Sequence, residues 1–139
     1  MYRELLEACS QNIEWVRIQK PASAAQIQEA EEAVGCRFPA ELKALLSELN
    51  GDRWLLFSTG EIMETTRSAR EGLGECYADI EKHLFFAGNG CGDYYCYNIL
   101  PDGKADGGAV YLWEHETNET RPVAGNLAEM IERYYHDEI

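Results

Sequence analysis

Long apolar runs are missing from this 139-residue sequence, whose apolar stretches are only a few residues long. A membrane-spanning helix needs about 20 predominantly apolar residues in a row, so the sequence predicts no membrane segment. Met1 leads directly into a helical pattern without the apolar stretch of a secretory signal, which favours a cytoplasmic location. The length is typical of one domain, and we interpret residues 1–139 as a single domain.

Basic residues are scarce: 12 Lys and Arg stand against 25 Asp and Glu, for a net charge of −13. Most of the excess lies in residues 71–139, which hold 14 acidic and four basic side chains. A field of that sign repels phosphate backbones, which argues against direct nucleic-acid binding. The acidity either steers a basic protein partner to the chain or provides a solubilising surface.

Cysteine pairs with metal-site or redox spacing are also absent. The five cysteines are odd in number and include no C-x-x-C motif, so free thiols in a reducing compartment are the simplest account.

Two glycine-containing loops resemble ligand-binding motifs but lack residues that these motifs require. Asp93 stands where a dinucleotide fingerprint needs its third glycine, and Lys104 and Trp113 stand where a calcium loop needs oxygen ligands. We therefore expect no metal, no cofactor and no nucleotide site.

Helical signals dominate the first third and the end of the chain. A helix is predicted over residues 2–10, a second follows the capping box of Ser23 and Gln26 and stops at Gly35, and a third runs from Pro39 to Asn50. Residues 126–136 form the last helix. Residues 65–80 are helical in composition but contain two glycines.

Strand signals fill the remainder, with aromatic and β-branched residues between glycine-dense turns. Strands are predicted over residues 54–57, 61–63, 84–87, 94–99, 109–115 and 120–123. This order predicts an α+β domain, in which N-terminal helices and a C-terminal helix pack on an antiparallel or mixed sheet of about five to six strands.

An ordered set of segments resembles a known family. Pro21 and Ser23 precede a helix, GCRFP at 35–39 separates two helices, LNG at 49–51 follows, and FFAGNGCGDYY at 85–95 and VYLWEHET at 110–117 come later. Together these are similar to the SUKH superfamily, in the branch named for the fungal cell-wall-assembly regulators Smi-one and Knr-four, over about residues 21–139. The resemblance implies an α+β fold without an enzymatic site. It also implies a role either as a bacterial immunity protein that neutralises a polymorphic toxin or as a regulatory interaction protein.

The aromatic strands carry the candidate binding residues. Alternation places Tyr95 and Tyr97 on one face of their strand, and Tyr111 and Trp113 on one face of the next. Tyr and Trp beside charged residues are typical of binding hot spots, although large rings also fill protein cores. We predict a partner-binding surface made of Asp93, Tyr95, Tyr97, Tyr111, Trp113, Glu114, His115 and Glu116. Asp93 has two interpretations, as a carboxylate that holds the glycine loop or as a contact to the partner.

These patterns favour a non-enzymatic binding protein of the immunity type, whose partner is a cognate toxin or another basic protein, such as a nuclease with a basic groove. A regulatory or scaffold module with an endogenous partner is the alternative. A third hypothesis is a small hydrolase that uses Cys91, with His115 and a carboxylate as its activating pair.

Overall fold

The first three helices begin and end where the sequence places caps and breaks. The computed structural model describes all 139 residues and contains α1 (Tyr2–Cys9), α2 (Ala24–Val34) and α3 (Ala40–Glu48). At the start of α2, the Ser23 hydroxyl accepts a hydrogen bond from the Gln26 N–H at 3.1 Å, and the Gln26 side chain accepts one from the Ser23 N–H at 2.9 Å. These two bonds are the predicted capping box, which satisfies two N–H groups that the helix leaves free.

The segment that follows α3 differs from the prediction. The strands expected over 54–57 and 61–63 are wrong, because α4 (Thr59–Leu73) is a helix and residues 54–57 form an irregular loop. Ser58 and Glu61 make a second capping box, with bonds of 3.1 and 3.0 Å, and this cap starts the helix at Thr59. The short 3₁₀ helix η1 (Ile80–Lys82) then leads into the sheet.

The sheet has four strands: β1 (His83–Gly88), β2 (Tyr94–Asn98), β3 (Val110–Glu114) and β4 (Glu119–Ala124). Their order is β1-β2-β3-β4 and every neighbouring pair is antiparallel. The four later predicted strands are therefore confirmed, and the two missing ones reduce the sheet below the predicted five to six. Only an isolated bridge between Leu56 and Ala87 remains of the earlier ones.

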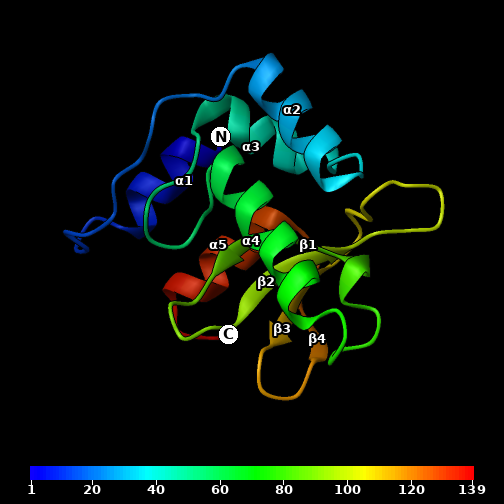
Figure 1. Ribbon diagram of the computed structural model, residues 1–139. Helices are drawn as coiled ribbons and strands as arrows, with labels where there is room; N and C mark the ends of the chain where they lie inside the picture. The colour runs from blue at the N-terminus through cyan, green and yellow to red at the C-terminus, as the bar shows by residue number, and fades with distance from the viewer.

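Both faces of this sheet are buried at β1, β2 and most of β3, whereas the first four residues of β4 are exposed. The larger core holds Tyr95, Tyr97 and Leu112 from one face, packed against apolar residues of α1, α2, α3 and α5 (Leu127–Tyr135). The smaller core holds Phe85, Cys96 and Trp113 from the other face, packed under Ala69 of α4 and Ile80 of η1. In Figure 1, α4 crosses in front of the sheet and α1–α3 gather above it. The predicted α+β class is confirmed.

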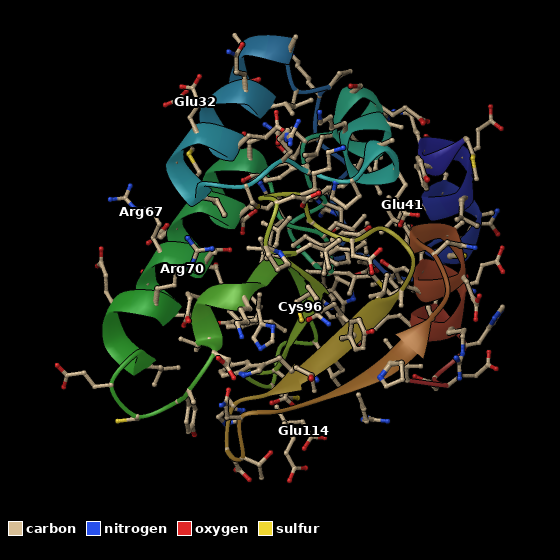
Figure 2. All side chains as sticks on the ribbon, turned by 90° about the vertical axis from the view of Figure 1, so that its right-hand side faces the viewer. Glu32, Glu41, Arg67, Arg70, Cys96 and Glu114 are labelled. Atoms are coloured by element: carbon tan, nitrogen blue, oxygen red, sulfur yellow. The ribbon has the colours of Figure 1, made fainter.

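The last helix is held at its first turn by two acceptors. Asn126 caps it by accepting from the Glu129 N–H at 2.8 Å, as predicted. Glu41 of α3 accepts from both the Leu127 N–H and the Tyr97 hydroxyl, each at 2.7 Å, and so joins α3, α5 and β2 (Figure 2). No helix combines the length and apolar composition that crossing a bilayer requires.

Candidate functional site

Two turns meet at one end of the sheet. Gly88 pairs with Tyr94 across the β1–β2 turn, Tyr94 pairs with Trp113 of β3, and Glu114 pairs with Glu119 across the β3–β4 turn. The antiparallel register therefore places both turns side by side. We call their polar side chains the acidic rim, which consists of Asp93, Glu114, His115, Glu116 and Glu119. Glu114 projects from this end of the molecule in Figure 2.

Asp93 joins the two turns through His115. Its Oδ1 lies 2.6 Å from His115 Nδ1 and accepts from the His115 N–H at 3.1 Å. Gly92 makes this contact possible, because a Cβ there would lie 3.0 Å from His115 Nδ1 and the residue has φ +94°. Asp93 therefore holds the opposite hairpin, a contact that neither of its two interpretations from the sequence, as a clamp of the glycine loop or as a contact to the partner, included.

The surroundings of Asp93 favour the ionised form of its carboxyl group. Partial burial acts to raise the pKa of this carboxyl, but the hydrogen bonds from the side chain and backbone of His115 outweigh it, so the pKa is lowered. His115 itself is 45% exposed and Asp93 is 22% exposed. The pair is therefore accessible from solvent while remaining fixed in position.

Two residues that the sequence did not single out support the β3–β4 turn. Asn118 accepts from Trp113 Nε1 at 2.8 Å and donates to the Ala78 carbonyl at 3.1 Å. Tyr77 donates its hydroxyl proton to the His115 carbonyl. Asn118 has φ +59°, a conformation that asparagine tolerates better than most residues, so an Asn inside a predicted hairpin turn was the available signal.

The predicted aromatic surface is not a surface in this structure. Tyr95 and Tyr97 are fully buried in the larger core, and Trp113 is 1% exposed in the smaller one. The two tyrosines and the tryptophan also lie on opposite faces of the sheet. Burial raises the pKa of the Tyr97 hydroxyl well above its ordinary value. Tyr111 is half-buried, so of the predicted binding residues only Tyr111 and the polar ones reach solvent.

Cys91 is exposed in the β1–β2 turn. Its N–H donates to Asn89 Oδ1 at 2.9 Å, and its thiol makes no hydrogen bond with His115, whose Nδ1 faces Asp93. His115 and Asp93 are paired as such a relay requires, but no hydrogen bond joins the Cys91 thiol to His115. No three His, Cys, Asp or Glu side chains gather closely enough to bind a metal ion.

A four-stranded antiparallel sheet, covered by helices on both faces and ending in an acidic rim, defines an α+β domain of the class that the sequence predicts. The chain belongs to the SMI1 / KNR4 family (SUKH-1), which it matches over residues 21–133. The suspected family is therefore confirmed. Membership is consistent with a role as an immunity protein or interaction domain. No protein of curated function matches the chain in sequence.

Asp93→Asn is expected to lower the free energy of unfolding by about 1 kcal/mol at neutral pH, because it weakens a hydrogen bond to a half-exposed partner. A lowered folded-state pKa means that the stabilisation is present above the ordinary value of 3.8 and is lost as the pH falls through the lowered pKa. Urea denaturation at pH 7 and at pH 3 measures both effects. Asp102→Asn is the control, since Asp102 accepts only from Lys104 N–H within its own turn. Equal losses in both variants would contradict the assigned role of Asp93.

Proposed function

We propose that this protein is a non-enzymatic immunity protein, which binds a cognate toxin and blocks its active site or substrate channel. The observation that carries the proposal is membership of the SMI1 / KNR4 family (SUKH-1) over residues 21–133. The sequence resemblance implies that bacterial members act in this way. Binding is favoured over hydrolysis because no hydrogen bond joins the Cys91 thiol to His115, so the thiol lacks an adjacent base to activate it.

The acidic rim is the surface that we assign to the toxin. Glu116 and Glu119 are exposed and Glu114 is half-exposed. The one ion pair of Glu114 is a 3.7 Å contact to the exposed Arg121. Exposed pairs of this kind contribute little stability, so the rim's charge is free to interact with a partner. The hairpin that carries it is held by Asp93, Tyr77 and Asn118. A fixed row of carboxylates is complementary to a basic groove, such as that of a nuclease.

Co-expression with the toxin encoded by an adjacent reading frame tests the proposal. We expect the protein to restore growth of cells that make this toxin and to co-purify with it. Loss of toxin activity in a purified mixture, at a one-to-one ratio, separates direct inhibition from an indirect effect. A chain that neither binds the toxin nor protects the cells would instead support a regulatory module with an endogenous partner.

Charge at the rim should control the rate of association. Replacing Glu114, Glu116 and Glu119 together by Gln is expected to slow association about tenfold at low salt, because steering by opposite charge raises on-rates by about 10-fold or more. Unfolding free energy should change by less than about 0.5 kcal/mol, as for ordinary surface substitutions. Stopped-flow mixing at low and physiological salt measures the on-rate.

The matched control removes the same three charges elsewhere. Glu4, Glu29 and Glu32 are exposed on α1 and α2, which lie at the other end of the molecule from the β3–β4 turn in Figure 1. Their replacement by Gln should change the on-rate much less than the rim variant does. Equal effects in both variants, or an on-rate that does not depend on salt, would reject the rim as the steering surface.

A further inference from the structure

A pocket on the opposite side of the molecule is lined by basic side chains. It has a volume of about 470 Å³, and Arg37, Lys43 and Lys104 line it without any acidic residue. The whole chain has 25 acidic and only 12 basic side chains, so this lining runs against its composition. The β2–β3 connection that carries Lys104 leaves the sheet at the end away from the acidic rim, on the right in Figure 1.

The backbone fixes where these charges lie. The Arg37 N–H donates to the Gly103 carbonyl at 2.8 Å, and the Ala105 N–H donates to the Arg37 carbonyl at 2.9 Å, so Arg37 and Lys104 form an isolated parallel bridge. Gly107 brings the same connection against the start of α3, since a Cβ there would lie 3.2 Å from the Pro39 Cβ. Like charges at paired positions of neighbouring segments repel each other, and a bound anion would relieve this repulsion.

The charges are only partly compensated within the chain. Lys43 Nζ lies 3.3 Å from Glu31 Oε2, an oxygen that also accepts from the Phe38 N–H at 2.8 Å. Neither the Arg37 guanidinium nor the Lys104 ammonium has an ion-pair or hydrogen-bond partner. Two further acids lie on the β2–β3 connection and accept from N–H groups of their own turns, Asp102 from Lys104 at 3.0 Å and Asp106 from Gly108 at 2.9 Å. Neither lines this pocket, although Asp102, Glu31 and Glu32 line a neighbouring pocket that also includes Arg37.

We propose that this pocket binds the phosphate group of a small molecule. A guanidinium pairs with two phosphate oxygens at once, and two ammonium groups supply further point charges, so a doubly charged anion matches the unpaired charges of Arg37 and Lys104. The pocket has room beyond one phosphate for the rest of the ligand. A net charge of −13 opposes the approach of a polyanion such as nucleic acid, which restricts the ligand to a small one.

Amide NMR spectra recorded during titration test the pocket directly. Inorganic phosphate and glycerol 3-phosphate are the probes, with acetate as the reference anion, all at one constant ionic strength. We expect both phosphates to shift the amide signals of Arg37, Ala40 and Lys104 with saturation in the millimolar range, on the order of 4 kcal/mol of binding free energy. Acetate should shift these signals far less.

Variants connect the binding to the named charges. Arg37→Gln and Lys104→Gln should each weaken phosphate binding about tenfold, since each removes charge-assisted hydrogen bonds. Arg67→Gln makes the same change on the outer side of α4, where Figure 2 shows the side chain pointing away from the protein, and should leave the affinity unchanged. All three side chains are exposed, and thermal unfolding without ligand checks that each variant folds.

Two results would overturn the proposal that this pocket binds phosphate. One is the absence of saturable shifts with either phosphate. The other is an equal loss of binding in the Arg67→Gln control, which would mean that phosphate binding depends only on the net charge of the protein. Tighter binding of glycerol 3-phosphate than of inorganic phosphate would support a phosphorylated small molecule as the ligand, and equal binding would support recognition of the phosphate group itself. The toxin assays above do not involve this pocket, so the two proposals succeed or fail separately.

Discussion

Trp113→Ala is expected to lower the free energy of unfolding by about 3–5 kcal/mol, the range for removing a large aromatic side chain from a core. The indole is 1% exposed and lies among Phe85, Cys96 and the helix residues Ala69 and Ile80. Its ring centroid lies 5.2 Å from that of Phe85. The substitution also leaves Asn118 without the donor that its side chain accepts from.

Tyr111→Ala is the matched control, because this ring belongs to the same strand and is half-buried. We expect it to cost less than half as much as Trp113→Ala, in proportion to the smaller area removed from water. Chemical denaturation of both variants gives the comparison. A Trp113→Ala variant as stable as the wild type would mean that the indole is not part of the core and would restore it as a binding residue.

The burial of Trp113 also shows where sequence reasoning stopped. Alternation correctly assigns the side chains of one strand to two faces, as for Leu112 and Trp113, but it does not relate the faces of neighbouring strands. Tyr95 and Trp113, which were expected on one surface, lie on opposite faces of the sheet. Alternation also does not say whether both faces are covered. The sequence indicates a helix only over residues 65–80 and strands over 54–57 and 61–63, so it does not place α4 over the second face and leaves open whether Trp113 is exposed or in the core. The capping box of Ser58 and Glu61 was the overlooked signal.

Helix boundaries with strong local caps were predictable for the opposite reason. Ser23, Gln26 and Asn126 act through bonds to residues three positions away, so the pattern is complete within a short segment. The pairing of Asp93 with His115 spans 22 positions and depends on the register of two hairpins. Composition identified both residues as candidates, whereas their contact required the fold.

Asp52 is a fully buried carboxylate that precedes the 54–57 loop. Its Oδ1 accepts from the N–H groups of Trp54, Leu55 and Leu56, each at 2.9 Å, while Oδ2 is buried without a partner. Beside these three bonds, the segment pairs with β1 only at the Leu56–Ala87 bridge, where the Phe57 N–H donates to the Phe86 carbonyl and the Gly88 N–H to the Leu55 carbonyl, each at 3.0 Å. Asp52→Ala would leave the N–H groups unpaired, two of them fully buried. We expect a loss of about 3 kcal/mol or more, at about 1–3 kcal/mol for each unpaired buried group.

Asp52→Asn separates the hydrogen bonds from the charge. The amide oxygen retains an acceptor for the three N–H groups but carries no charge, so we expect this variant to be much more stable than Asp52→Ala.

Desolvation raises the pKa of Asp52 despite the three bonds, which means that the folded state holds a proton at pH values where the unfolded chain has lost it. The stability of the wild type relative to Asp52→Asn should therefore fall as the pH rises above the ordinary value of 3.8, and then level off once the pH exceeds the raised pKa. Urea denaturation of both proteins from pH 3 to pH 8 gives this difference. A relative stability that increases with pH would mean that the three N–H bonds outweigh the burial of the carboxylate, and that Asp52 holds the loop as an ion.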